Sequence, residues 1–369
     1  MKIVFIHQDL FFQGGQLVTA RLASGLAARG HHVEMIVSKV HVDIQNANPT
    51  AKPFSIPPNV PLHVLPSRRA MKNVVALGLL LRKIRPDVVV TCVGHYNQCA
   101  VLAKTFFRLK APIAYIEHNM ARTRCVRNWR ASFNRWCLNR TAKIVAVSDG
   151  VRNCIVESLA IPSEKVVRIY NPILDVPDGN KVQAEIHPWL LKNPRPFSVV
   201  AAGALTNACK GFDVLIGAFD KFHSKYKDSQ LVIFGEGVDH LLLQKQICGL
   251  HLNDSVVLAG FTHCLADNFC NADCLAHASR NETFGMVLVE ALAAGLPVVA
   301  TDCPVGPREI LSDGALGQLV PVDDADKLAA ALERVYKKKF VPTEKFNPEP
   351  YRYDFVIGEY EDLLAEVVG

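Results

Sequence analysis

The stretch of sequence that decides the fold runs from residue 274 to residue 300 and reads CLAHASRNETFGMVLVEALAAGLPVVA. It opens with a short apolar run (274–276), passes through a polar loop and enters a helical segment near Phe284. Gly295-Leu296-Pro297 ends that helix and leads into a second apolar run, 297–300. Two buried strands joined through a helix form a βαβ unit, which predicts a parallel sheet covered by helices on both faces.

The same alternation recurs on both sides of this stretch. Besides Cys274 to Ala276 and Pro297 to Ala300, we predict four more strands in the second half of the chain: Phe197 to Ala202, Gln230 to Phe234, Val256 to Leu258 and Gly317 to Val320. In the first half we predict Lys2 to His7, His32 to Val37, Asp87 to Cys92, Ile113 to Glu117 and Ala142 to Val147. The proline- and asparagine-rich segment 41–66 is predicted to be a long loop.

Domain organisation follows from length and from a turn-rich break. A chain of 369 residues is too long for one ordinary core. The break lies at 172–197, so we predict two doubly wound α/β domains, 1–172 and 197–350, facing each other across a cleft. The last segment, 351–369, is predicted to be a helix that packs on the surface or crosses back to the first domain.

Composition limits the class of protein. The formal net charge is +6, which is mildly basic, and 11 cysteines occur without any CxxC pair. Scattered cysteines of this kind indicate reduced core residues rather than a metal site. The N-terminus turns polar too soon for a signal peptide, and no apolar run approaches about 18 residues. We therefore expect a cytoplasmic protein.

The residues that follow the strand 274–276 suit a phosphate ligand. A helix that begins near Phe284 and Gly285 offers unpaired N–H groups and the positive end of its dipole, through Gly285, Met286 and Val287. Glu290 lies further along the helix, where a carboxylate could hold two ribose hydroxyls, and Glu282 lies in the preceding loop. The alternative is an ordinary amphipathic helix with two surface glutamates.

At this point the segment resembles the E-x7-E motif of the family 4 glycosyltransferases, the group 1 glycosyltransferases with the GT-B fold. Glu282 and Glu290 stand at the motif's spacing, and the match continues through Thr301 to Leu311. It is similar to members that build bacterial surface polysaccharides, including lipopolysaccharide. The resemblance implies two Rossmann-like domains, an acceptor-side one at 1–172 and one at 197–350 that binds a nucleotide sugar.

Further positions match family landmarks. The resemblance implies that Lys210 pairs with the donor diphosphate and that His118, after the strand 113–117, faces the donor sugar, so His118, Glu282 and Lys210 are the expected catalytic residues. The expected donor-binding residues also include Gly14, Gly15, Gly203, Gly235, Gly237, Arg280, Phe284, Gly285, Met286, Val287 and Glu290. One position departs from the pattern: Ala204 stands where the family usually has Arg, so Arg280 or Arg308 compensates, or the diphosphate is held weakly.

The resemblance implies a retaining, metal-independent transferase that uses no cofactor besides its nucleoside-diphosphate sugar, with uridine as the first base and guanosine as the second. The expected acceptor is a glycan or a lipid-linked glycan of the cell envelope. Two alternatives remain open at this point. One is a sugar-nucleotide epimerase or phosphorylase on the same two-domain fold, and the other is a non-catalytic nucleotide-sugar binding protein.

A basic, aromatic segment lies between Lys104 and Lys143. Arginines there are interleaved with Trp129, Phe133 and Trp136, and only Glu117 opposes them. We predict an amphipathic helix that contacts anionic lipid, placing the protein at the inner face of the plasma membrane. The alternative is a solvated helix whose aromatic rings face the core. No motif of a nucleic-acid-binding fold accompanies the cations, so nucleic acid is not an expected partner.

Overall fold

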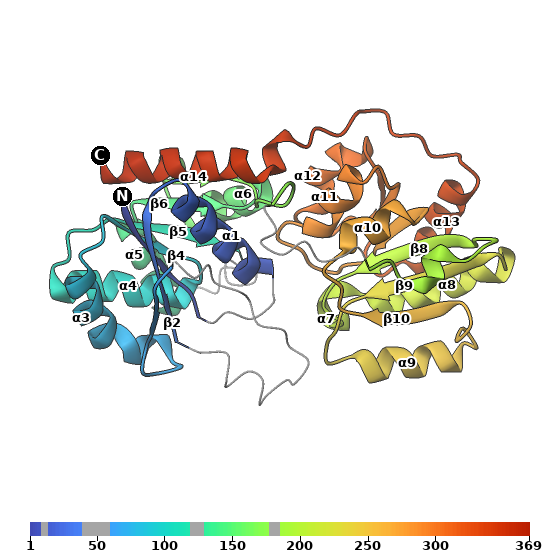
Figure 1. Cartoon of the computed structure of the whole chain (residues 1–369), viewed down its shortest axis with the longest axis horizontal. Coiled ribbons are helices and arrows are strands. Elements are labelled where there is room, and N and C mark those ends of the chain that lie inside the picture. The colour runs from blue at the N-terminus through green and yellow to red at the C-terminus, as the bar shows by residue number, and fades with distance from the viewer. Residues whose placement is uncertain (9–13, 39–59, 119–128, 177–184) are drawn as a thin grey trace. The chain divides into compact units, whose positions relative to one another are not determined.

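The computed structural model describes residues 1–8, 14–38, 60–118, 129–176 and 185–369. The chain divides into two compact units. Unit 1 comprises Met1–Val176 together with Glu349–Gly369, and unit 2 comprises Pro177–Pro348. Each unit has its own parallel sheet (Figure 1). Each also has its own hydrophobic core. The prediction of two doubly wound α/β domains is therefore confirmed, whereas the predicted cleft between them stays a prediction.

Unit 1 is built on a seven-stranded sheet in the order β3-β2-β1-β4-β5-β6-β7. The strands are short and rich in Val and Ile, as strands buried on both faces require. Their bounds are β1 (Lys2–Ile6), β2 (His32–Val37), β3 (Leu62–Val64), β4 (Val88–Thr91), β5 (Ile113–Glu117), β6 (Lys143–Ala146) and β7 (Val166–Arg168). All described pairings are parallel, for example Ile3 of β1 beside Val88 of β4.

Two edge strands of unit 1 were not predicted from the sequence. β3 lies inside the segment predicted to be a loop, so that prediction is wrong over Leu62–Val64; residues 39–59 of the segment lie outside the described residues. β7 was not predicted at all. Each has only three residues, too few to show a hydrophobic period, and each is stabilised by pairing with its neighbour in the sheet.

Helices cover both faces of the unit 1 sheet. On one face, α3 (Val74–Ile84), α4 (Gly94–Phe107) and α5 (Trp129–Arg140) pack over a core that includes Val4, Ile36 and Val89. α1 (Gly14–Ala28) contacts β2, and α6 (Asp149–Leu159) contacts β6, starting at Ser148, whose Oγ accepts from the Val151 amide.

The terminal helix α14 (Tyr353–Val368) belongs to unit 1 (Figure 1). It packs along α1 and also contacts β4. Arg29 bonds to Glu361 at 2.8 Å, and the Tyr353 hydroxyl donates to the Arg21 carbonyl at 3.1 Å. The chain thus leaves unit 1, forms unit 2 and returns, because the apolar face of α14 finds its partner surface on α1.

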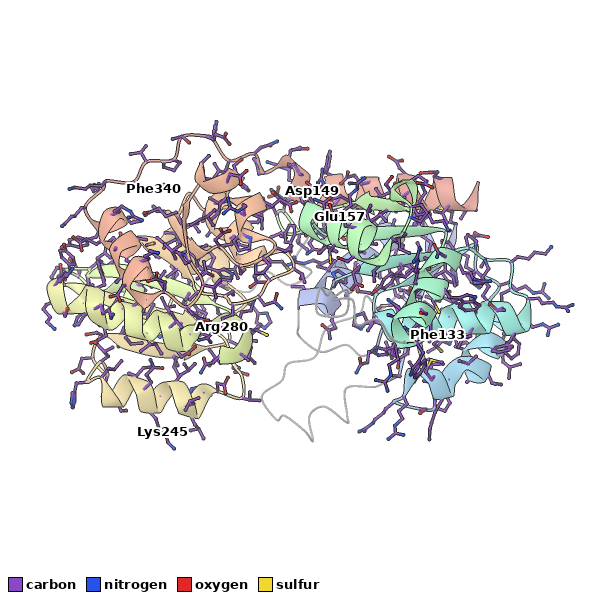
Figure 2. All side chains as sticks on the ribbon, turned by 180° about the vertical axis from the view of Figure 1, so that it is seen from behind. Phe133, Asp149, Glu157, Lys245, Arg280 and Phe340 are labelled. Carbon is purple, nitrogen blue, oxygen red and sulfur yellow. The ribbon has the colours of Figure 1, made fainter. Side chains whose placement is uncertain are left out.

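Helix α5 differs from the predicted lipid-binding helix. Trp129 is exposed, but Phe133 and Trp136 pack against the unit 1 core, and the Arg140 guanidinium lies over the Trp136 ring at 3.9 Å (Phe133 is labelled in Figure 2). Two of the three aromatic rings therefore face the protein, as expected for the alternative of a solvated helix whose aromatic rings face the core. Arg122, Arg124 and Arg127 of the same segment lie outside the described residues.

Unit 2 has a six-stranded parallel sheet in the order β10-β9-β8-β11-β12-β13. The strands are β8 (Phe197–Ala202), β9 (Ser229–Phe234), β10 (Val256–Gly260), β11 (Cys274–His277), β12 (Val298–Thr301) and β13 (Gln318–Val320). The helices are α7 (Asn207–Lys210), α8 (Phe212–Lys225), α9 (His240–Gly249), α10 (Leu265–Cys270), α11 (Met286–Ala293), α12 (Pro307–Ile310) and α13 (Ala325–Tyr336). The core gathers around Phe219, Leu231 and Leu332, from α8, β9 and α13.

No helix among the described residues is both long enough and apolar enough to cross a bilayer.

The contact between α1 and α14 allows a stability test. A Cβ built on Gly25 of α1 would lie 2.5 Å from Ile357 Cδ1 and 2.9 Å from the Tyr353 hydroxyl of α14. We predict that Gly25→Ala lowers the free energy of unfolding by about 1–3 kcal/mol, because the buried contact is overpacked.

Gly358→Ala is the matched control, because its Cβ would meet only the end of the Arg29 side chain at 3.4 Å. It should leave stability unchanged or raise it by up to about 1 kcal/mol. Both values come from denaturant unfolding curves, and equal effects of the two substitutions would show that α14 does not pack as described.

Candidate functional site

The topology of unit 2 points to one edge of its sheet. After β8 the chain builds β9 and β10 on one side and then returns to build β11 on the other, so β8 and β11 are neighbours in space. This is a topological switch point, and α/β proteins bind ligands outside the carboxyl ends of the strands there. The predicted unit 2 residues lie on the loops that follow β8, β9 and β11.

Three predicted glycines allow close backbone contacts at this edge. Gly203 follows β8, and a Cβ on Gly235, after β9, would lie 1.9 Å from the Gly203 carbonyl oxygen. A Cβ on Gly237 would lie 2.4 Å from the Leu205 carbonyl oxygen. Gly235 also has φ +138°, in the region that favours glycine. These glycines let the two loops run against each other; their contact with a nucleoside stays a prediction.

The loops after β8 and β11 are joined by an ion pair between two predicted catalytic residues. The Lys210 Nζ, at the end of α7, donates to Glu282 Oε1. The same oxygen accepts from Ser279 Oγ at 2.9 Å. His277 Nε2 lies 3.1 Å from it but is not aligned for a hydrogen bond, and it is buried without another partner among the described residues.

This environment keeps Glu282 ionised. Burial raises the pKa of the Glu282 carboxyl, but the Lys210 ammonium and the His277 ring outweigh burial and hold the pKa well below its usual range. The carboxyl is only 10% exposed. A carboxylate in this state is an acceptor of hydrogen bonds and not a general acid at neutral pH.

Gly211 makes the ion pair geometrically possible. It separates α7 from α8 and adopts φ +60°, and a Cβ there would lie 2.2 Å from the Ala278 carbonyl oxygen. The loop after β11 therefore runs directly against the start of α8, which brings Glu282 within reach of Lys210.

Arg280, a predicted donor-binding residue, is paired with carboxylates of unit 2. Its guanidinium bonds to both Asp213 oxygens at 2.8 Å, to Asp323 Oδ1 at 2.6 Å and to the Asn207 carbonyl, so four of its five N–H donors are used (Arg280 is labelled in Figure 2). These carboxylates raise the pKa of Arg280. Arg280 therefore holds the Glu282 loop against α7 and α8, and its contact with a diphosphate stays a prediction.

Arg308, the other predicted substitute for the missing arginine, is also paired. Its guanidinium bonds to Asp302 and, at 3.2 Å, to Asp313, and it is exposed. Ala204 itself is exposed, immediately after Gly203. Both arginines are thus paired with carboxylates, and their compensation for Ala204 stays a prediction.

The predicted helix N-terminus is present at α11. Gly285 is its N-cap with φ +103°, and Met286 and Val287 form its first turn. Phe284 is buried, and a Cβ on Gly306 would lie 2.1 Å from the Phe284 carbonyl oxygen, so the turn is tightly packed. Glu290 is half-buried about one turn further along, on the motif spacing from Glu282.

In unit 1 the predicted residues also gather at a carboxyl edge. His118 directly follows β5, and a Cβ on Gly15, in the first turn of α1 beside Gly14, would lie 3.6 Å from His118 Cγ. His118 Nε2 is buried and has no hydrogen-bond partner among the described residues. Burial and the nearby His7 ring lower the pKa of His118 to about 3, so the imidazole is neutral at physiological pH.

Sequence reasoning missed several residues of these two edges. His7, His277 and Ser279 were not singled out. His7 ends a predicted strand, His277 directly follows another, and Ser279 lies two residues further along the same loop, at the edge where ligands bind. Asp213 and Asp323, the partners of Arg280, carried no signal, because a surface aspartate reveals nothing of its partner.

These features define a protein with the GT-B fold, and comparison with solved structures agrees. HepE of Anabaena, solved in complex with UDP, superimposes with a TM-score of 0.77 at 18% identity, covering 99% of this chain and 100% of that one. The model for glycosyltransferase family 4 matches residues 12–174, and the model for group 1 glycosyl transferases matches residues 196–338. The chain belongs to the family 4, group 1 glycosyltransferases.

Several curated proteins with similar sequences are named as glycosyltransferases. The phosphatidyl-myo-inositol mannosyltransferase of Mycolicibacterium smegmatis is 35% identical over 51% of this chain, and an amylovoran biosynthesis glycosyltransferase of Erwinia amylovora is 24% identical over 77% of it and 79% of that protein. The chain spans less than half the length of two relatives: the alignment covers 46% of the mannosyltransferase and 23% of an exopolysaccharide phosphotransferase of Streptomyces coelicolor.

The Lys210–Glu282 pair leads to a prediction about stability and pH. Lys210→Met leaves a buried carboxylate with weaker partners and should lower the free energy of unfolding of unit 2 by about 2 kcal/mol at pH 7. The folded-state pKa of Glu282 lies below the ordinary 4.5, so its stabilisation is present above that pH and is lost as the pH falls through the folded pKa.

The destabilisation by Lys210→Met should therefore shrink as denaturant unfolding is repeated at progressively lower pH. Lys221→Met is the control: it breaks the exposed pair with Asp326 and should change stability by less than about 1 kcal/mol. A loss that is the same at every pH, or equal to the control, would contradict the described electrostatics.

Proposed function

We propose that the protein is a glycosyltransferase that moves a sugar from a nucleoside diphosphate to a glycan or lipid-linked acceptor in the synthesis of a bacterial cell-envelope polysaccharide. The observation that carries this proposal is the Lys210–Glu282 pair at the switch point of unit 2, in a chain of this family. This pair places a cation that can stabilise a leaving diphosphate beside a carboxylate that can accept hydrogen bonds from sugar hydroxyls.

Lys210 would stabilise the leaving group. As the bond between the anomeric carbon and the phosphate oxygen breaks, negative charge grows on the diphosphate and must be met where it appears. The Lys210 ammonium would turn from Glu282 toward the phosphate oxygens, and the amides of Gly285, Met286 and Val287 at the start of α11 would add a positive dipole. Ser279 and His277 would remain beside Glu282 and keep its charge compensated.

The sugar transfer is proposed to retain the anomeric configuration. The acceptor hydroxyl attacks the face that the phosphate leaves, its proton passes to the departing phosphate oxygen, and no covalent glycosyl-enzyme forms. Glu282 then binds sugar hydroxyls as an ionised acceptor, which agrees with its lowered pKa. His118 is neutral, and its buried Nε2 has no hydrogen-bond partner among the described residues. It would bond to a sugar hydroxyl from unit 1.

Protein cations are proposed to stabilise the negative charge of the diphosphate in place of a metal ion, so the transfer would need no divalent ion and no cofactor. UDP-sugar is the first candidate donor, supported by the solved complexes of HepE with UDP and with UDP-glucose. A guanosine donor is second. The acceptor class rests on the names of the relatives, which act on phosphatidyl-myo-inositol or in amylovoran biosynthesis.

The deciding experiment is a binding screen of nucleotide sugars, followed by product analysis with cell-envelope lipid as acceptor, with and without a chelator. A sugar joined to the lipid in the donor's anomeric configuration, formed equally with the chelator, is the expected result. Epimerised or free sugar without transfer, or binding without turnover, would refute the proposal.

Glu290 provides a test of donor binding. Glu290→Ala is expected to weaken nucleotide-sugar affinity by about tenfold or more, because the ribose hydroxyls lose a charged partner, as measured by calorimetry. Glu309→Ala, a nearby substitution on α12, is the control and should leave affinity unchanged. Unchanged affinity in Glu290→Ala would remove the ribose assignment.

Ala204 provides the converse test. Its exposed position after Gly203 leaves room for a longer side chain, and the family pattern has Arg there. We predict that Ala204→Arg tightens binding of the nucleoside diphosphate by about tenfold, since a second cation would face the phosphates. Ala204→Gln adds similar length without charge and should bind like the original chain; equal gains from both would contradict the electrostatic reason.

A further inference from the structure

The positive charge of the chain is concentrated in one part of unit 1. Residues 60–118 carry nine Lys and Arg side chains and two acidic ones, a net charge of +7, while the whole chain has +6. The rest of the chain is therefore close to neutral. The two acidic residues are Asp87, which accepts from the Lys2 amide, and Glu117 at the end of β5.

Much of this charge surrounds a hollow of about 760 Å³. The hollow lies between the C-terminal ends of α3 and α4 and the segments that lead into β4 and β5, at the amino edge of the sheet. His118 follows the carboxyl end of β5, at the opposite edge. The hollow is thus separate from the residues assigned to sugar transfer.

The hollow is lined by cations and apolar side chains together. Its five cations are Arg82, Arg85, Lys104, Arg108 and Lys110. Lys104 is half-buried and donates to the Ala111 carbonyl at 2.6 Å, and burial lowers its pKa. Within the described part of the chain, no carboxylate pairs with the other four. Such a lining suits a phosphate group attached to an apolar body.

An exposed apolar stripe runs along the 3₁₀ turn Ala70–Asn73 and the following helix α3 toward this hollow. Met71, Val75 and Leu79 follow one another at intervals of four residues and are 47%, 62% and 56% exposed. Phe106, at the end of α4, lines the hollow and is 72% exposed. Lys72, Arg82 and Lys83 flank the stripe, and all three are exposed.

Helices α3 and α4 pack against each other (Figure 1), so the stripe and the hollow lie on neighbouring helices. A Cβ on Gly78 would lie 2.2 Å from the Phe107 ring, so the absence of a side chain at Gly78 lets Phe107 pack inward. Phe106, the preceding residue, is then left facing solvent. The exposure of Phe106 therefore follows from the helix packing.

Cations near a helix C-terminus stabilise the helix dipole, which accounts for part of the charge at Arg82, Arg85 and Arg108. It does not account for four large apolar side chains exposed beside them. A surface with an apolar stripe flanked by cations lowers its free energy at the boundary between anionic headgroups and acyl chains. The apolar side chains enter the acyl region there, while the cations contact the headgroups.

We propose that the face formed by residues 70–85 and 104–110 docks on an anionic lipid bilayer. The stripe of Met71, Val75, Leu79 and Phe106 enters the interface, and the cations around the hollow bind lipid phosphate groups. This assignment replaces α5 as the lipid-binding element and does not depend on the proposed sugar transfer. Each cation near such a surface contributes about fivefold to binding, equivalent to about 1 kcal/mol.

The test is flotation of the full chain with phosphatidylcholine vesicles, with and without phosphatidylglycerol. The chain should bind only the anionic vesicles and should be released by high salt, which screens exposed charges. Leu79→Glu and the double variant Arg82→Ser/Arg108→Ser should each reduce binding by about tenfold or more. Thermal unfolding checks that each variant is folded, as expected for exposed positions.

Helix α9 of unit 2 supplies a matched control. Leu241 is 75% exposed, and Lys245 lies on the same helix, exposed to solvent (Figure 2). Leu241→Glu makes the same kind of change as Leu79→Glu, and Lys245→Ser removes one cation from a surface without the cation cluster. Both should bind vesicles like the original chain. Equal losses in the α3 and α9 variants, or no loss in either, would overturn the proposal.

Two further outcomes would also overturn it. The first is tight binding of inorganic phosphate that Leu79→Glu does not alter, with no vesicle binding, because the hollow would then be a site for a soluble anion. The second is self-association of the chain that Leu79→Glu abolishes while vesicle binding persists, because the stripe would then contact a second copy.

Discussion

The bond between Lys210 and Glu282 joins the two loops that leave the unit 2 sheet on opposite sides of its switch point. The surrounding residues allow the two loops to approach and hold them in place. Gly211 removes the Cβ that would collide with the Ala278 carbonyl. Arg280 ties the Glu282 loop to Asp213 and to Asp323. A buried carboxylate needs such partners, because burial without them raises its pKa and favours the protonated form. A protonated Glu282 would be a neutral hydrogen-bond donor instead of a charged acceptor.

The same interaction explains how a site can be stable before its ligand arrives. In the described state Lys210 compensates Glu282, and a bound diphosphate would compete for the same ammonium. Ser279 and His277 stand beside the carboxylate and would keep its charge compensated during that exchange. Unit 1 presents the opposite case: His118 is buried beside another imidazole and is therefore neutral, so it can bond to a hydroxyl without adding charge.

Parallel α/β sheets have two chemically different edges, and unit 1 illustrates both. The carboxyl edge carries His118 and the glycines at the start of α1, whereas the amino edge, where α3 and α4 end, carries the cations around the hollow. Since strands of one sheet all point the same way, residues far apart in sequence reach the same edge. A site and a docking surface can thus share one small unit without sharing residues.

The sequence by itself determined the two sheets and the motif residues. Apolar runs such as Ile3 to Ile6 form strands wherever they are buried on both faces, and the spacing from Glu282 to Glu290 places both on one loop-and-helix segment. These are local properties of neighbouring residues, so they survive without knowledge of the fold. The three-residue strands β3 and β7 are the exceptions, because only pairing with a neighbour makes them strands.

Tertiary structure alone decided which charges are paired and which apolar side chains are covered. Arg280 finds Asp213, 67 residues away, and Lys210 finds Glu282, 72 residues away. Phe133 and Trp136 of α5 meet the core, while Phe106 does not, because Phe107 takes the space beside Gly78. Side-chain interactions act over a few ångströms in space, and distance along the chain does not reveal which residues folding brings that close.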